Sequence, residues 1–197
     1  MNLPGHLTER HGPMFASKTI FLVDNLNRYA DLGFSTAYIN TVKDDRSDNG
    51  VSTNCSGGVS LSKKVDKFSV NDLSEFNRHV GKYKVLAIDE FQFFENSVNV
   101  VLEWIERYNK IIYVAGLDLN AKRKKWGSIL DLAGQAEDSQ KVTAKCLDCL
   151  REGQGIVSAP FTSRIDPNGP DVETGGDDKY LPVCRLHWNR HNDQYLI

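Results

Sequence analysis

The sequence predicts an α/β fold built on a parallel sheet. Two short apolar runs, residues 85–88 and 111–115, have the length of buried strands, and segments with helical spacing of apolar residues alternate with them. Near the start of the chain, residues 12–19 approach the pattern of a phosphate-binding loop that opens a helix. Short strands alternating with helices are typical of a parallel sheet covered by helices.

Composition fits one globular chain with a core of its own. The 197 residues are 40% hydrophobic and 25% charged, with a formal net charge of -2, so no basic surface for nucleic acid is indicated. No run of 18 apolar residues suggests a membrane span, and residues 1–12 lack the apolar centre of a signal peptide. We therefore expect a cytoplasmic protein that binds neither nucleic acid nor membranes.

The elements of the α/β part follow from periodicity and turn residues. Helices are predicted over residues 18–32 and 98–108, strands over 36–39, 85–88 and 111–115, and a polar, mobile loop over 43–58. Ser69 is expected to cap a helix that ends near His79, with Asp72 as its third residue. Residues 6–11 (HLTERH) stand where a buried strand should lead into the phosphate loop, but their polar side chains would be hard to bury unpaired.

The character of the sequence changes near residue 141. Glycine, proline, cysteine and short strand-like runs replace the alternation of strands and helices. We therefore expect two domains, a nucleotide-binding α/β domain over residues 1–140 and a smaller, metal-binding domain over residues 141–197.

The candidate phosphate loop nearly fits G-x-x-x-x-G-K-[ST]; it comprises Gly12, Pro13, Met14, Phe15, Ala16, Ser17, Lys18 and Thr19. Backbone N–H groups of such a loop and the positive end of the following helix bind phosphate. Lys18 would reach the outer phosphates and Thr19 would bind Mg²⁺. Ser17 occupies the position of a glycine, which is unfavourable if the backbone there needs a positive φ. Taken alone, the motif could equally be a chance helix start.

Two acids end the apolar run at residues 85–88. In open parallel sheets, ligands bind beyond the carboxyl ends of the strands, where Asp89 and Glu90 would lie. Asp89 suits the Mg²⁺ that bridges nucleotide phosphates, and Glu90 suits a base that accepts the proton of an attacking hydroxyl. The alternative is a solvated turn, which is less compatible with the apolar run before it.

Two pairs of potential metal ligands lie in the C-terminal part. Cys146 and Cys149 are separated by two residues, and so are Cys184 and His187. Three thiolates and one imidazole match a closed, tetrahedral, structural zinc site. The alternative is a set of free core cysteines with a surface histidine. Cys55 is left over as a free thiol.

Several longer motifs together resemble one family. They are GPMFASKT, IDEFQFF, VAGLD followed by KRKKWGSILDLA, CLDC, and GGDDKYLPVC, in that order from residue 12 to residue 187. The combination is similar to the type II, zinc-containing thymidine kinases. The resemblance implies a RecA-like P-loop parallel sheet, a small C-terminal zinc-binding domain, and a lasso loop over about residues 161–182 that closes over the nucleoside.

The resemblance also implies an activity and its residues. The enzyme would transfer a phosphoryl group from ATP to the 5′-hydroxyl of thymidine, with deoxyuridine as a further candidate, for DNA precursor salvage, and would be a homotetramer. Glu90 would be the general base. ATP and Mg²⁺ would be bound by the phosphate loop with Asp44, Arg46, Asp89 and Gln92. The nucleoside would be bound by Met14, Phe161, Thr162, Val172, Glu173, Thr174 and Tyr180.

Four features depart from the family pattern. Ser17 replaces a glycine, Ala121 replaces a phenylalanine that stacks on the base, residues 6–11 are polar, and the hairpin between Cys149 and Thr162 is longer. They motivate a second hypothesis, a degenerate member that binds nucleotide weakly and is inactive. A third, a zinc-ribbon nucleic-acid-binding ATPase, conflicts with the negative net charge.

Overall fold

The computed structural model describes residues 4–44, 60–166, 169, 173 and 175–192. Cys55, Arg46, Val172, Thr174 and most of the loop expected over residues 43–58 lie outside this range.

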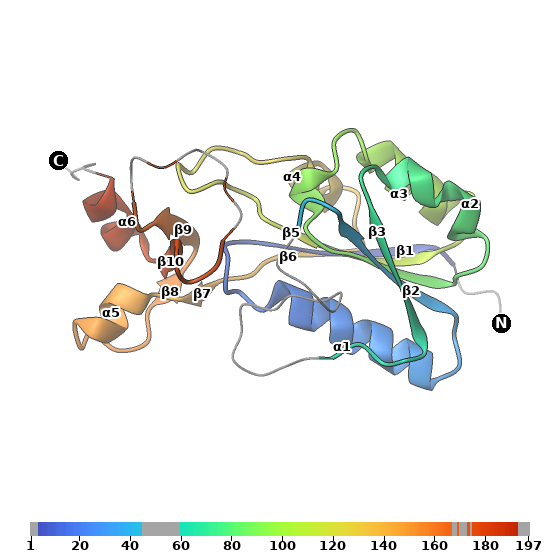
Figure 1. Cartoon of the computed structure of the whole chain (residues 1–197), viewed down its shortest axis with the longest axis horizontal. Coiled ribbons are helices and arrows are strands. Elements are labelled where there is room, and N and C mark those ends of the chain that lie inside the picture. Colours follow the sequence, from blue (N-terminus) through green and yellow to red (C-terminus); the bar gives the residue numbers. More distant parts are fainter. Residues whose placement is uncertain (1–3, 45–59, 167–168, 170–172, 174, 193–197) are drawn as a thin grey trace.

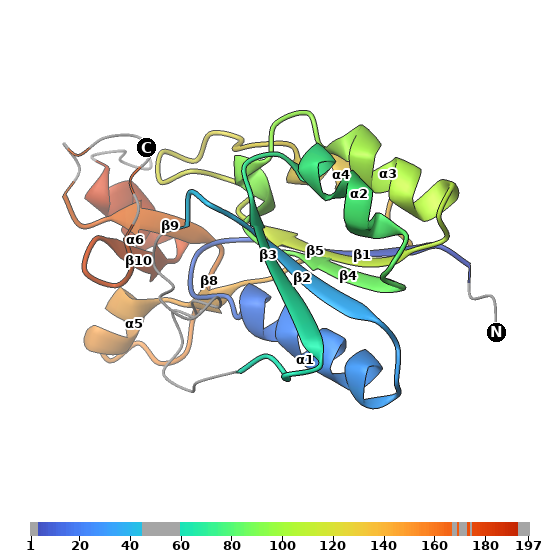
Figure 2. The same ribbon diagram turned by 45° about the vertical axis from the view of Figure 1, so that its right-hand side comes forward.

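A six-stranded parallel sheet forms the larger part of the molecule, in the strand order β3-β2-β4-β5-β1-β6. The strands are β1 (His6–His11), β2 (Thr36–Thr41), β3 (Val65–Val70), β4 (Val85–Ile88), β5 (Ile111–Gly116) and β6 (Asp138–Lys141). Helix α1 (Lys18–Asp31) covers one face, and α2 (Asn77–Val80), α3 (Val98–Glu106) and α4 (Ile129–Ala133) lie on the other (Figures 1 and 2). The predicted parallel α/β fold is therefore confirmed.

A smaller lobe lies beyond the carboxyl ends of the strands (Figure 1). It contains two short antiparallel pairs and two helices: β7 (Ala144–Lys145) with β8 (Ser158–Ala159), β9 (Phe161–Arg164) with β10 (Tyr180–Val183), α5 (Leu147–Arg151) and α6 (Arg185–His191). Since ligands of parallel sheets bind beyond the carboxyl ends of their strands, this arrangement places the second lobe over that region.

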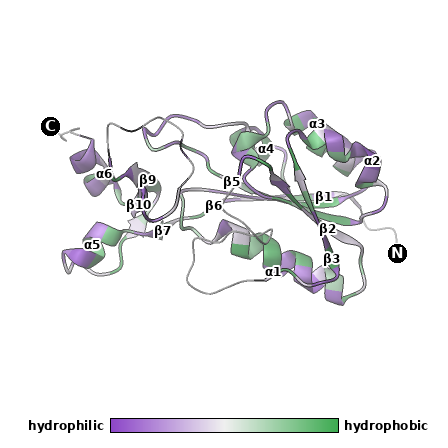
Figure 3. Cartoon of the chain, in the orientation of Figure 1, coloured by the Kyte–Doolittle hydropathy of each residue, from purple (hydrophilic) through white to green (hydrophobic). Residues whose placement is uncertain are grey.

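The central strands of the sheet are buried on both faces. Every residue of β2, β4 and β5 is buried, which is why β4 and β5 read as continuous apolar runs. One face packs Leu22 and Leu26 of α1, and the other packs Trp104 of α3. Figure 3 shows the matching alternation of hydrophobic and hydrophilic residues along α1 and α3. Within the described residues, no helix combines the length and apolar composition needed to cross a bilayer.

Most predicted elements agree with the structure, but the expected cap at Ser69 is wrong. Ser69 lies in β3, opposite Asn40 of β2. The cap belongs to Asp72, whose carboxylate accepts the Ser74 N–H at 2.7 Å, while the Glu75 carboxylate accepts the Asp72 N–H at 3.2 Å. This capping box starts a 3₁₀ turn, so α2 begins later, at Asn77, than the sequence suggested.

The polar residues 6–11 form β1, between β5 and β6 in the sheet. Glu9 is fully buried, and its carboxylate accepts the Ser139 hydroxyl at 2.7 Å and contacts His11 Nδ1 at 3.0 Å. Arg10 pairs with Asp138 at 2.7 Å. The neighbouring strand β6 therefore supplies the partners that allow this polar strand to be buried.

We expect Glu9→Ala to lower the free energy of unfolding by about 2–4 kcal/mol, because it leaves a cavity at a fully buried position and removes the acceptor of the Ser139 hydroxyl. Urea denaturation measures the change. Asp31→Ala is the matched control, since the Asp31–Lys64 ion pair is exposed and should contribute little. Equal losses in the two variants would contradict a structural role for the buried carboxylate.

Candidate functional site

A cleft of about 950 Å³, open to solvent, lies between the carboxyl ends of the strands and the second lobe. Its walls come from the phosphate loop, the ends of β4 and β5, the segment after β5, and the second lobe. Its lining includes thirteen of the predicted site residues: Met14, Phe15, Ala16, Ser17, Lys18, Thr19, Asp44, Asp89, Glu90, Gln92, Thr162, Glu173 and Tyr180.

The phosphate loop has two non-glycine residues with positive φ. Phe15 has φ 65°, and Ser17 has φ 57° and ψ 26°, a left-handed conformation that favours glycine. Ser17 immediately precedes α1, whose fourteen residues direct their positive end at the cleft. Lys18 Nζ donates to the Pro13 carbonyl at 2.6 Å, so the loop curls around its own lysine.

Gly12 begins the loop at a point where a side chain has no room. Its φ is 150°, and a Cβ built there would lie 2.2 Å from the Val142 carbonyl oxygen. Gly12 and Pro13 do not line the cleft; they turn the chain from β1 into the loop.

Asp89 is buried at the end of β4 and accepts three hydrogen bonds. Thr19 Oγ1 and the Tyr38 hydroxyl both donate to its Oδ2 at 2.7 Å, and the Glu90 N–H donates to Oδ1 at 2.9 Å. Burial and the adjacent charge of Glu90 raise the pKa of Asp89 to about 6, against the opposing effect of the hydrogen bonds. Burial, with the nearby charge of Asp89, also raises the pKa of Tyr38, which keeps the phenol a donor.

Glu90 is held toward the cleft by an unusual backbone conformation and by Gln92. Its φ of 52° and ψ of 42° are left-handed, a strained state for a non-glycine residue that is common at functional sites. Gln92 Nε2 donates to Glu90 Oε2 at 2.5 Å, and Gln92 Oε1 accepts the Leu117 N–H at 2.8 Å. Gln92 thus connects Glu90 to the segment that follows β5.

The other end of the cleft is largely apolar. Met14, Leu117 and Tyr180 form a buried cluster against which Phe15, Ala121 and Trp126 pack. Trp126 also contacts Phe93 edge to face, with ring centroids 5.2 Å apart. The Met14 N–H donates to Thr162 Oγ1 at 3.0 Å, which joins the phosphate loop to β9. An apolar slot with few polar groups suits a flat, uncharged ring.

Two of the residues expected to bind nucleoside have contacts that the sequence did not indicate. Phe161 does not line the cleft; its ring packs in the core of the second lobe. Glu173 does line it, but its carboxylate pairs with Lys179 at 2.6 Å and with Arg164, and its carbonyl accepts the Tyr180 hydroxyl at 2.8 Å. Asp44, also in the cleft, accepts an Asn40 side-chain N–H at 3.1 Å.

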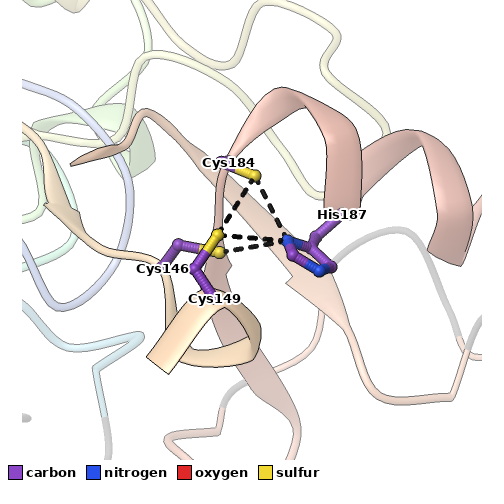
Figure 4. A group of neighbouring side chains, drawn as sticks. All are labelled: Cys146, Cys149, Cys184 and His187. Carbon is purple, nitrogen blue, oxygen red and sulfur yellow. Dashed lines mark hydrogen bonds between the residues drawn. The ribbon is translucent and has the colours of Figure 1, made fainter. Parts of the chain in front are cut away.

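The structure brings the four predicted metal ligands together, although they come from two separate parts of the chain (Figure 4). Cys149 Sγ lies 3.8 Å from Cys184 Sγ, and His187 Nδ1 lies 3.2–3.5 Å from the three sulfurs. In a tetrahedral zinc site, sulfur atoms lie about 3.8 Å apart, and sulfur and nitrogen about 3.5 Å apart. His187 Nε2 lies 3.1 Å from Glu152, a partner that orients such a ligand. The donor set and its spacing therefore fit zinc.

Several residues that line the cleft or support it from behind were missed by sequence reasoning. Tyr38 lies in the middle of a buried strand, where a tyrosine reads as core, and only the pairing of β2 with β4 brings it to Asp89. Phe93 and Trp126 occur in the sequence analysis only within the longer motifs IDEFQFF and KRKKWGSILDLA. The available signal for the wall of the cleft after β5 was Asn120, a polar residue between Leu119 and Ala121.

Taken together, the cleft has a cationic, phosphate-sized loop and two acids at one end and an apolar slot at the other. Glu90 lines the cleft, and a carboxylate in this position can accept a proton from a bound hydroxyl group. Oxygen atoms of Thr19 and Asp89 lie side by side, as a hard divalent cation requires.

Comparison with known proteins points in one direction. A family model described as "Thymidine kinase" matches residues 5–188. A thymidine kinase of Oryza sativa subsp. japonica is 35% identical over 94% of this chain and 66% of its own, longer chain. A thymidine kinase of Myxoma virus (strain Uriarra) is 35% identical over 88% of this chain and 90% of its own. The human protein "Thymidine kinase, cytosolic" is 32% identical over 89% of this chain and 69% of its own.

We expect Ser17→Gly to raise nucleotide affinity or turnover and to raise the thermal midpoint, because glycine removes about 1 kcal/mol of left-handed strain. Calorimetry and ATP titration measure both effects. Ser97→Gly is the matched control, since Ser97 has φ -88° and glycine offers no relief there. A fall in affinity and turnover would mean that the loop is adapted to serine.

Proposed function

The chain belongs to the thymidine kinase family, of the zinc-containing type, and from this membership we propose that it phosphorylates the 5′-hydroxyl of thymidine with ATP. The observation that carries the proposal is that a charged, polar end and an apolar end occur in the same cleft. Lys18, Thr19, Asp89 and Glu90 line one end, and the apolar slot around Met14 and Tyr180 forms the other.

The phosphate loop is the proposed site of the ATP phosphates. The N-terminus of α1 and its loop offer backbone N–H groups and a positive helix end, and Lys18 supplies a mobile cation next to them. Release of Lys18 from the Pro13 carbonyl would let its ammonium follow the transferring phosphoryl group. Asp44 and, from the resemblance, Arg46 complete the proposed phosphate end.

Mg²⁺ fits the oxygen atoms at the end of β4. Thr19 Oγ1 and the Asp89 carboxylate are hard oxygen donors 2.7 Å apart, and the family activity implies this cation as the partner of ATP. When bound, Mg²⁺ would neutralise charge on the phosphates. The Tyr38 hydroxyl, which remains hydrogen-bonded to Asp89, orients the carboxylate from behind.

Glu90 is the proposed general base. The thymidine 5′-oxygen would form its bond to the γ-phosphorus of ATP as the bond to the β-phosphate oxygen breaks, ADP would leave, and Glu90 would accept the hydroxyl proton. Gln92, which the sequence assigned to ATP and Mg²⁺, donates to Glu90 and is better regarded as the residue that orients it.

The apolar slot is the proposed site of the thymine base. Met14, Thr162 and Tyr180 lie at it, and main-chain groups at Val172, Glu173 and Thr174 are the proposed hydrogen-bond partners. Phe161 supports this wall through its neighbour Thr162. A base bound at its polar edge by fixed groups is discriminated strongly from bases that leave those groups unpaired.

The departures from the family pattern do not favour an inactive member. Ser17 adopts the left-handed conformation despite its side chain, and the polar β1 is satisfied by β6. Ala121 lacks the stacking ring, yet Trp126 adds an aromatic ring at the same cleft. Thymidine kinase activity is therefore the better hypothesis.

The remaining proposals rest on the resemblance and on the metal cluster. We propose structural zinc held by Cys146, Cys149, Cys184 and His187, a homotetramer, a cytoplasmic location and a role in supplying precursors for DNA synthesis. Deoxyuridine, which lacks only the methyl group of thymine, is the proposed second substrate. The two-domain division near residue 141 stays a prediction.

Incubation of the purified, zinc-loaded chain with ATP, Mg²⁺ and labelled thymidine tests the function directly. We expect thymidine monophosphate, less product from deoxyuridine, and none from purine deoxynucleosides. A folded sample that phosphorylates none of them would favour the inactive alternative.

We expect Glu90→Gln to lower kcat by roughly 10²–10⁴-fold, because the amide cannot accept the hydroxyl proton. Binding of thymidine and ATP should change little, since the side chains are nearly equal in size. Steady-state kinetics measures the change in kcat, and calorimetry measures the change in binding of thymidine and ATP. Glu95→Gln, outside the cleft, is the control. An unchanged kcat would exclude Glu90 as the base.

A further inference from the structure

One wall of the cleft is a hairpin over residues 117–126 that lies outside the main sheet. It extends from the end of β5 toward the second lobe (Figures 1 and 2). Leu119 and Lys125 form an isolated antiparallel bridge, and the Asn120 N–H donates to the Lys124 carbonyl at 2.9 Å. Its residues in the cleft are Leu117, Leu119, Asn120, Ala121 and Trp126.

Residues of α6 and β9 hold the tip of the hairpin against the second lobe, and Leu119 packs against the core of that lobe. The Trp188 indole N–H donates to the Ala121 carbonyl at 2.9 Å. The Arg123 guanidinium lies over two rings, 4.4 Å from the centroid of Phe161 and 4.7 Å from that of Trp188. Both rings are buried, so the contact is sheltered from water.

Arg123 depends on these rings for its interactions. Over the part of the chain that the structure describes, its guanidinium forms no ion pair with a carboxylate. Its backbone has φ 58°, a left-handed conformation that fixes the tip of the hairpin. The contacts of the Arg123 side chain with two aromatic rings, together with its strained backbone, indicate that the hairpin is attached specifically to the second lobe.

The surface that receives Arg123 is built beside the metal ligands. Trp188 directly follows His187 on α6, and Phe161 of β9 pairs with Val183 of β10, the residue before Cys184. A metal ion held by these ligands would therefore also restrict the movement of both rings, which contact the hairpin.

We propose that Arg123 and Trp188 are positioning residues for the nucleoside, which hold the hairpin against the metal-binding lobe and so fix one wall of the thymidine pocket. The proposal rests on the proposed thymidine kinase function. If the hairpin detached in part of the molecules, the apparent affinity for thymidine would fall in proportion to the fraction still attached. The phosphate end would be affected much less, because its residues come from the phosphate loop and β4.

The double variant Arg123→Met and Trp188→Phe tests this attachment. Methionine keeps an unbranched stem without the cation, and phenylalanine keeps a ring without the N–H. We expect the KM for thymidine to rise about fivefold, from loss of one hydrogen bond and the two cation–π contacts of Arg123. The KM for ATP should stay within about twofold, and zinc per chain, measured by atomic emission, should not change.

Arg185→Met is the matched control. The Arg185 guanidinium also lies over the Phe161 ring, at 5.0 Å, but it belongs to α6 and not to the hairpin. Its removal should leave the KM for thymidine unchanged. An equal rise in this control would show that any lost cation disturbs the lobe, which would overturn the proposal.

Two further outcomes are decisive. If the double variant loses zinc, Arg123→Met alone carries the test, and a KM for thymidine within twofold of wild type would overturn the proposal. If the wild-type chain phosphorylates thymidine and the zinc-loaded double variant keeps its KM, the hairpin needs no such attachment while the kinase function stands. A wild-type chain without thymidine turnover would instead overturn the proposed function, and the nucleoside role of the hairpin with it.

Discussion

The buried carboxylate of Asp89 organises the site. It joins three parts of the chain that are distant in sequence, because Thr19 of α1, Tyr38 of β2 and the Glu90 backbone all donate to it. Burying a carboxylate in this way is unfavourable unless its oxygens are satisfied. The three donors therefore fix the phosphate loop, the central strands and the strained Glu90 relative to one another.

The rest of the cleft is arranged around this fixed point. Gln92 extends the network from Glu90 to the end of β5, and Thr162 ties the phosphate loop to the second lobe through the Met14 N–H. The two ends of the cleft thus belong to one hydrogen-bonded frame, with the proposed phosphate-binding features on the sheet side. The proposed zinc would stabilise the opposite side, where the second lobe has a small core of its own.

Sequence reasoning succeeded where a local pattern has a single physical solution. The apolar runs ending at Ile88 and Gly116 could only be buried strands, and the paired spacing around Cys146 and Cys184 indicated ligands that the fold brings together. It failed where partners come from far along the chain. The polar strand β1 is intelligible only with Ser139 and Asp138 of β6 beside it, and Tyr38 only with β4 beside β2. The misplaced cap at Ser69 has a local cause, since Asp72 and Glu75 offered a better capping box three residues on.

The position of β1 also constrains how the protein is made. Its neighbours in the sheet, β5 and β6, end at Gly116 and Lys141, so β1 can be inserted between them only after residue 141 has been synthesised. Until then Glu9 has no Ser139 beside it, and β1 is a polar segment with no reason to be buried. Such long-range pairing slows folding. Until β1 is inserted, the edge of β5 that pairs with it is exposed to other chains. The polar character of β1 keeps the waiting segment soluble during synthesis, which an apolar strand in that position would not do.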